Sequence, residues 1–185
     1  MSFQFSTSAR NGALDAIEVA AGASAILRLR TGSPPANCAA ARSGTVLATM
    51  NLPADYMSAA SGGVKSLLGS WQDSAADASG ETGMFEIMDS AGTTCHMQGL
   101  CSAPWQASKA YVIGSTVHNS GNVYRATAAG TSSATGPSHN SGSAADGGVT
   151  WLFVQAGTDM TIDNGTLVAG QPVNSTAFTI TAGGA

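Results

Sequence analysis

Charged residues are scarce in this sequence. Lys, Arg, Asp and Glu make up 10% of its 185 residues, against roughly a quarter in ordinary soluble domains. The seven basic residues are scattered and outnumbered by eleven acidic ones, so no basic stripe could displace counterions from phosphates, and nucleic-acid binding is not expected. A surface so poor in charge suits a protein that packs against copies of itself or other subunits, where each buried charge would cost desolvation.

Long apolar runs and paired cysteines are also lacking. No run approaches the roughly 18–20 apolar residues that a membrane span needs, and the opening residues MSFQFSTSARNG have neither the basic nor the apolar region of a signal peptide. We therefore expect no membrane association and synthesis in the cytoplasm. Cys38, Cys95 and Cys101 form no CxxC pair. The default expectation is three buried, reduced side chains, and a Cys95–Cys101 disulfide is the alternative.

Residue types that carry catalysis are present but not grouped. His96, His118 and His139 are dispersed along the chain with no carboxylates at ligand spacing, so we expect no metal and no cofactor. Neither a G-x-S-x-G nucleophile motif nor a phosphate-binding G-x-x-x-x-G-K loop occurs. The sequence therefore predicts no catalytic residues and a protein that is not an enzyme.

One segment near the start has helical periodicity. Its apolar residues recur on one stripe of a helix, namely Ala13, Leu14, Ile17, Ala20 and Ala21. Arg10, Asp15 and Glu18 lie off this stripe, as in an amphipathic helix. Ser6, or one of the two residues after it, can cap the start, and Gly22 is placed to end the helix.

After the helix the apolar pattern has period two, which is typical of β-strands. Ala25, Leu27 and Leu29 share one face of a strand, and turns are predicted at residues 90–92 and 163–165. Strands this short with turns this frequent predict a mainly β fold, an antiparallel β-sandwich or barrel with one N-terminal helix.

The composition changes between residues 100 and 154, where aromatic residues gather while the flanks are aliphatic. Excising this stretch leaves HMQGL beside GTDMTIDN, as partners in a hairpin would lie. We predict a discontinuous main domain of residues 1–102 and 155–185, comprising an N-terminal arm, the helix and the sandwich. Residues 103–154 are predicted to be a small β-module inserted at a loop tip, where insertions are tolerated.

The main-domain segments LDAIEVAAGASAILRLRTGSPPANCAAARSGTVLATMNLP, GSWQDSAADASGETGMFEIMDSAGTTCHMQG and DMTIDNGTLVAGQPVNSTAFTIT resemble a family of small virion structural proteins of tailed bacteriophages and prophages. The resemblance implies a capsid decoration (cement) protein that stabilises the head lattice, with a tail or fibre component as the alternative. It also implies the major capsid protein or other virion subunits as partners, a homo-oligomer (dimer or trimer) and localisation in the virion.

The inserted segment resembles the small chitin-binding or carbohydrate-binding β-modules of chitinases and phage fibres. The shared pattern of aromatic, Gly and Val residues is Trp105, Tyr111, Gly114, Val117, Gly121 and Tyr124. This resemblance implies contact with a host surface glycan or receptor, and we name Trp105, Tyr111, Tyr124 and Trp151 as candidates. Of these, Tyr111 and Trp151 are expected to be the more exposed. The alternative is that all four form the core of the module.

Three further aromatic residues are candidates for contact with a neighbouring subunit or the capsid. Phe3 and Phe5 precede the helix on an arm that could reach a neighbour. Trp71 is a candidate because Trp is enriched where interfaces bind most tightly. A core position closing one edge of the sandwich is an equal alternative for Trp71.

Overall fold

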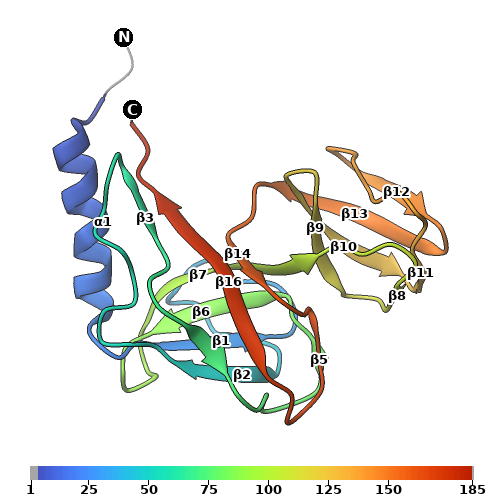
Figure 1. The fold of residues 1–185 in the computed structure, drawn as a ribbon, viewed down its shortest axis with the longest axis horizontal. Coiled ribbons are helices and arrows are strands. Elements are labelled where there is room, and N and C mark those ends of the chain that lie inside the picture. The colour runs from blue at the N-terminus through green and yellow to red at the C-terminus, as the bar shows by residue number, and fades with distance from the viewer. Residues whose placement is uncertain (1–3, 185) are drawn as a thin grey trace.

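The computed structural model describes residues 4–184 as a mainly β protein with a single helix (Figure 1). The fold class predicted from the sequence is confirmed, and within the described residues the large sheet does not close into a barrel. In Figure 1 the helix lies at one side, the main sheet in the middle and the segment 103–154 at the other side. Phe3 lies outside the described residues.

Helix α1 (Thr7–Ala21) has the bounds that the sequence predicts. At its start, the hydroxyl of Ser6 accepts a hydrogen bond from the backbone N–H of Ala9 at 3.2 Å, which satisfies one of the open amides of the first turn. At its end, Gly22 has a φ of 81° and its N–H donates to the carbonyl of Glu18. Glycine adopts this left-handed conformation without steric cost, so it terminates the helix.

The main domain is built on four antiparallel strands in the order β2 (Val46–Asn51), β1 (Ile26–Arg30), β6 (Met84–Met88) and β7 (Cys95–Pro104). The predicted alternation in β1 is confirmed, because Leu27 and Leu29 are fully buried. The predicted turn between β6 and β7 is confirmed by a hydrogen bond from the N–H of Gly92 to the carbonyl of Asp89.

The sheet continues from β7 to β14 (Met160–Ile162) and then to the long strand β16 (Val173–Thr181). Strand β16 also pairs with β3 (Val64–Ser66) and β4 (Trp71–Asp73). A separate ladder joins β5 (Gly80–Glu81) to β15 (Thr166–Leu167). Side chains from these strands form the larger core, which contains Trp71, Phe85, Met160 and Phe178.

The segment after β7 contributes six strands: β8 (Ala110–Tyr111), β9 (Thr116–Asn119), β10 (Asn122–Ala128), β11 (Gly130–Thr131), β12 (Ser143–Asp146) and β13 (Val149–Ala156). They surround a second hydrophobic cluster, which is formed by Tyr111, Val117, Tyr124, Ala126, Val149 and Trp151. Whether residues 103–154 fold as a unit of their own stays a prediction.

Strand β7 connects the two parts of the molecule. Along its length it pairs with β6, then with β14 through Cys101 and Ser102, and finally with β9 through Ala103 and Pro104. The pairing of β7 with β14 is parallel, so the prediction that the flanks of the insertion form a hairpin is wrong. Parallel neighbours need a long crossover connection, and the segment 103–154 is that crossover.

The polar segment 127–148, which has few large side chains, is held by the chain's own contacts. Strand β11 pairs with β8, and the carbonyl of His139 accepts a hydrogen bond from the hydroxyl of Tyr124 at 2.8 Å. Gly130 lies so close to Gly148 that a Cβ atom on Gly130 would stand 2.3 Å from the carbonyl oxygen of Gly148. Small residues are required here because two stretches of backbone touch.

Candidate functional site

The four aromatic residues proposed to contact a glycan do not form an exposed platform. Trp151 and Tyr124 are fully buried, Tyr111 is 4% exposed, and Trp105 is half-buried against the same cluster. The rings of Tyr111 and Trp151 pack edge to face with centroids 4.9 Å apart. The expectation that Tyr111 and Trp151 are exposed is therefore wrong. A module of about 50 residues needs its few aromatic side chains to build a core.

A buried carboxylate holds this aromatic cluster together. One oxygen of Asp146 accepts hydrogen bonds from the indole N–H groups of both Trp105 and Trp151, each at 2.9 Å, and the other accepts from the backbone of Ser133 at 2.8 Å. Burial alone would raise the pKa of Asp146, but the hydrogen bonds from Ser133 and the two indoles outweigh it and lower the pKa. No motif or spacing in the sequence marks Asp146 as a partner of these tryptophans.

Trp71 belongs to the main core. It is 1% exposed, its indole N–H points to the carbonyls of Tyr56 and Leu68 at 3.1 and 3.2 Å, and its ring packs against Phe178 at 5.3 Å. The prediction of a subunit contact through Trp71 is wrong for the folded chain, and the core alternative is correct.

Phe5 lies on the surface beside the C-terminal end of the chain. Its side chain is 50% exposed, and its backbone N–H donates to the carbonyl of Gly184 at 2.8 Å. Phe5, Ala9, Ala13 and Ala182 line part of a hollow of about 240 Å³ between the helix and that end. The backbone of Phe5 is thus bound to the segment that follows β16. Contact of Phe5 with a neighbouring subunit stays a prediction.

Helix α1 packs onto the rest of the chain through Leu14 and Ala21, its two buried residues, and through charged side chains that lie beside them. Glu18 accepts hydrogen bonds from the backbone N–H groups of Tyr56 and Met57, and Asp15 accepts one from Ala60. These carboxylates take the place of water for amides that no strand partner satisfies. Leu14 and Ala21 of the predicted apolar stripe are buried as expected, whereas Ala13 and Ala20 of that stripe are exposed. Asp15 and Glu18 do not face solvent alone, because both contact the segment before β3.

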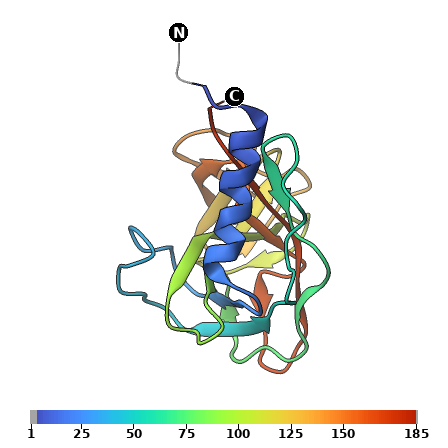
Figure 2. The ribbon, with the colours of Figure 1, turned by 90° about the vertical axis from the view of Figure 1, so that its left-hand side faces the viewer.

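The opposite side of the helix is uncharged and faces solvent. The exposed residues of α1 are Thr7, Ser8, Ala9, Gly12, Ala13, Ala16, Val19 and Ala20. We call the surface made by Ala9, Gly12, Ala13, Ala16, Val19 and Ala20 the outer face of α1. Val19, in the last turn of the helix, is 79% exposed. In Figure 2 helix α1 lies in front of the rest of the described chain.

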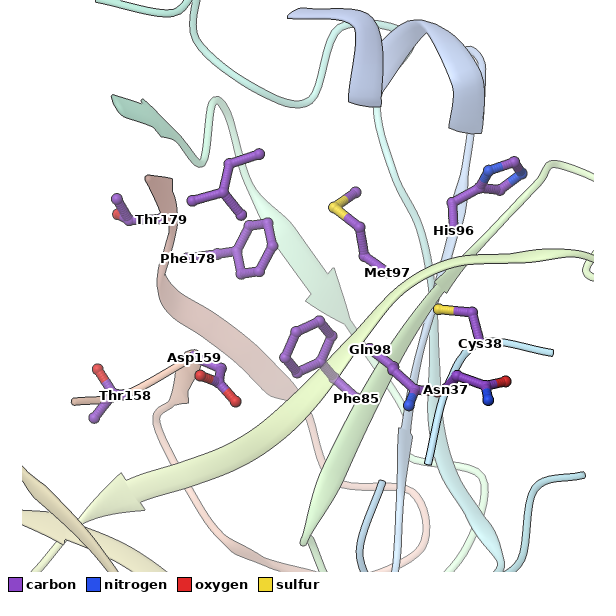
Figure 3. A pocket seen from close by; sticks show the side chains of 11 residues that line it. Asn37, Cys38, Phe85, His96, Met97, Gln98, Thr158, Asp159, Phe178 and Thr179 are labelled. Carbon is purple, nitrogen blue, oxygen red and sulfur yellow. The ribbon is translucent and has the colours of Figure 1, made fainter. Parts of the chain in front are cut away.

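A cavity of about 430 Å³ opens between β7 and β16 (Figure 3). Phe85 and Phe178 form its floor, with ring centroids 5.4 Å apart, and Met97 lies beside them. Asp159, on its wall, already accepts hydrogen bonds from the backbone of Leu100 at 2.9 Å and from the side chain of Gln155 at 3.0 Å. The floor of this cavity is therefore apolar, and its walls carry polar side chains.

The cysteines are arranged differently from the alternative raised by the sequence. The Sγ atom of Cys95 lies 3.1 Å from that of Cys38, in the loop between β1 and β2. Cys101 is fully buried in the main core, six positions further along β7. Six residues of extended strand span about 20 Å, so a Cys95–Cys101 disulfide is excluded by geometry.

Three arginines converge on one buried carboxylate close to this cysteine pair. Glu86 is fully buried and is paired with Arg30 at 2.7 Å, with Arg28 at 4.0 Å and with Arg42. Arg42 also donates to the carbonyl of Cys38 at 2.9 Å. The cluster anchors the loop of residues 31–45 to the sheet.

The histidines remain dispersed in space. His118 lies 3.1 Å from the hydroxyl of Ser102, and burial lowers its pKa. Among residues 4–184, no three side chains of His, Cys, Asp or Glu come together as metal ligands would. In the same range no helix has both the length and the apolar character needed to span a bilayer.

No protein-family model matches this sequence, and comparisons with curated proteins and with solved structures find no match.

Proposed function

We propose that this chain is a structural subunit of a bacteriophage virion, a head decoration (cement) protein whose outer face of α1 binds the major capsid protein. The observation that carries this proposal is the uncharged side that the helix presents to solvent. Asp15 and Glu18 bind backbone amides of the chain itself, and the solvent-facing side has no charge and carries Val19 at 79% exposure. An uncharged helix face can be buried in an interface without a desolvation cost for charge.

The mechanism is mass action on the assembled shell. A protein that binds the closed lattice and not its free subunits stabilises the lattice in proportion to its occupancy. The hollow beside Phe5 lies at one end of the outer face and can receive an apolar side chain of the capsid subunit. Ala9 and Ala13 belong to both surfaces, and Arg10, which also lines the hollow, is the one charged residue of its lining. The segment 103–154, at the far side of the molecule in Figure 1, then points away from the shell.

The test is a charge placed on the outer face, at its most exposed large apolar residue. Val19→Lys should lower binding to shells of the major capsid protein at least tenfold, since an unpaired charge would be buried in the contact. Ser141→Lys adds the same charge to an exposed position in the segment 103–154 and should bind as the wild type does. Binding is measured by co-sedimentation with purified shells. Wild-type binding by Val19→Lys, or an equal loss in both variants, would contradict the proposal.

A second function, a tail or fibre subunit whose inserted module contacts a host receptor or glycan, is favoured by one observation. Val112 and Ile113, in the turn after β8, are 52% and 68% exposed. Neighbouring exposed apolar side chains are suited to contact with a partner. Changing both to Ser should then reduce adsorption of particles to host cells and leave the particles intact. Unchanged adsorption would reject this function.

A further inference from the structure

We propose that Cys38 and Cys95 are the site of a reversible intrachain disulfide that locks the loop of residues 31–45 onto strand β7. The two residues are 57 positions apart in the sequence, yet their Sγ atoms lie 3.1 Å apart. A disulfide bond is about 2.05 Å long, so the sulfur atoms need to approach by only about 1 Å. This inference concerns the chain alone and does not depend on the proposed function.

The surroundings of the pair favour this bond over other fates of the thiols. Cys101 is enclosed in the main core and cannot compete for Cys95. A hollow of about 340 Å³, lined by Cys38, Arg42, Thr93, Thr94 and Cys95, gives a small oxidant access to the pair from solvent. Cys38 is the more exposed of the two thiols, so it is the one that an oxidant meets first.

In a reducing environment both cysteines stay in the thiol form. Burial is the main cause that raises the pKa of Cys38 to about 11, the neighbouring Cys95 adds to it, and Glu86 acts in the same direction while the charge of Arg42 opposes it. Only a small fraction of thiolate exists at neutral pH, and oxidation should be slow there. The thiolate is the nucleophile. As long as the pH is below that pKa, the oxidation rate should therefore rise about tenfold for each unit by which the pH is raised.

The reaction needs a low-molecular-weight disulfide such as oxidised glutathione. The thiolate of Cys38 attacks one sulfur of glutathione disulfide, forming a mixed disulfide and releasing one glutathione thiolate. The thiolate of Cys95 then attacks the Cys38 sulfur, forming the intrachain bond and releasing the second glutathione thiolate. The two protons lost by the cysteines are taken up by the two glutathione thiolates. The protein dithiol loses two electrons, and glutathione disulfide gains them.

The bond would fix more than the two cysteines. The loop of residues 31–45 also contacts β7 through a hydrogen bond from Gln98 to the carbonyl of Pro35 at 2.7 Å, and it contacts the inserted segment through Ser33 and Arg125. Asn37 and Cys38 form one wall of the 430 Å³ cavity in Figure 3. Oxidation therefore sets the width of that cavity and tightens the connection between the two parts of the molecule.

The experiment uses the purified full chain, equilibrated either with dithiothreitol or with oxidised glutathione at pH 8. Thiols are counted after acid quenching and denaturation, and cross-linked peptides are identified by mass spectrometry without reduction. The expected count falls from three free thiols to one, with a single Cys38–Cys95 peptide. The melting temperature should rise by roughly 5–15 °C on oxidation, because the bond closes a long loop in the unfolded chain.

Variants assign the effect to the pair. Cys38→Ser should retain two thiols in oxidised glutathione, or carry glutathione on Cys95, and should lose the rise in melting temperature. Cys101→Ala is the matched control and should still form the bond. Three free thiols in the oxidised wild type, glutathione adducts without an intrachain bond, bonds between chains only, or a bond that involves Cys101 would each overturn the proposal. The thiol count of the wild type decides the question even if a variant fails to fold.

Discussion

The ammonium group of Lys65 lies 2.9 Å from a carboxylate oxygen of Glu18, inside the contact between strand β3 and helix α1. Asp15 supplies a second carboxylate oxygen at 2.8 Å, and the Lys65 side chain is 4% exposed. Burial alone would lower the pKa of Lys65, but the hydrogen bonds and charges of Asp15 and Glu18 outweigh it and raise the pKa. The helix is thus held to the sheet by a paired buried charge as well as by backbone amides.

Replacing this lysine should loosen the helix. Lys65→Met should lower the free energy of unfolding by about 2–4 kcal/mol, because it leaves the partly buried carboxylate of Glu18 without its cation. Urea denaturation followed by tryptophan fluorescence measures the loss. Lys109→Met is the matched control, since Lys109 lies over the Tyr111 ring at 5.4 Å and should contribute less than about 1 kcal/mol. Equal losses in the two variants would show that the pairing has no special role.

Asp146 should be the most sensitive polar residue of the inserted segment. Asp146→Asn should lower the free energy of unfolding by about 2–3 kcal/mol, because the amide group cannot accept from both indoles and from Ser133 at once and leaves a buried donor unsatisfied. The measurement is urea denaturation with the fluorescence of Trp105 and Trp151 as the probe. Asp163→Asn, at an exposed turn where Asp163 accepts from Asn174, is the control and should cost less. A neutral Asp146→Asn would mean that the indoles do not depend on the carboxylate.

The same carboxylate gives the segment a defined pH dependence. The pKa of Asp146 in the folded chain is lowered from its ordinary value of 3.8, so the stabilisation is complete above that value and is lost as the pH falls through the folded pKa. We expect the tryptophan emission of the wild type to stay unchanged from pH 7 to about 4 and to shift at lower pH. The shift should be absent or displaced in Asp146→Asn. An identical acid transition in both proteins would assign it to other groups.

Features set by neighbouring residues were predictable from the sequence, and features set by distant ones were not. Ser6 and Gly22 bound the helix because a cap acts within one turn. Periodicity also showed correctly that Asp15 and Glu18 share a side of the helix. It could not show that both carboxylates lie beside the buried Leu14 and Ala21, because that depends on the backbone amides of residues 56–60, about 40 positions away.

The candidate binding residues show the same limit. The aromatic pattern of residues 105–151 located a cluster, but an aromatic residue in a small module can serve either the core or a ligand. The structure decides for the core, through Trp151 and Tyr111. Asp146 was missed because its partners Trp105, Ser133 and Trp151 come from three separate stretches of the chain. The proximity of Cys38 to Cys95 likewise arises only when β1 pairs with β6 and β6 with β7.

Because Gly130 lies close to the backbone of Gly148, any side chain at position 130 should destabilise the fold. A methyl group on Gly130 would stand 2.3 Å from a backbone oxygen, and backbone cannot yield as a flexible side chain can. Gly130→Ala should therefore lower the free energy of unfolding by about 2–3 kcal/mol, measured by urea denaturation. Gly183→Ala is the control, since nothing lies within 4 Å of its added methyl group. If both variants behave alike, the segment 127–148 is looser than its contacts imply.

Replacing Gly12, inside the helix, and Gly22, just after its end, by alanine should change the free energy of unfolding in opposite directions. Gly12 lies on the outer face of α1 with nothing within 4 Å of an added Cβ atom, so Gly12→Ala should raise the free energy of unfolding by about 0.5–1 kcal/mol through reduced backbone freedom in the unfolded chain. Gly22 has a φ of 81°, which alanine adopts only at a cost. Gly22→Ala should therefore lower the free energy of unfolding by about 1 kcal/mol. Urea denaturation of each variant and of the wild type measures the two changes in the free energy of unfolding.

The Gly12 variant also probes the proposed docking surface. The added methyl group leaves the outer face uncharged and changes only how closely a neighbour can approach it. Gly12→Ala should therefore be more stable than the wild type as a free chain, yet bind capsid shells more weakly if the capsid protein packs directly against the helix. Greater stability together with unchanged binding would place the contact elsewhere on the molecule. Lower stability of the free chain would instead mean that the helix is not held in the conformation in which Gly12 faces solvent.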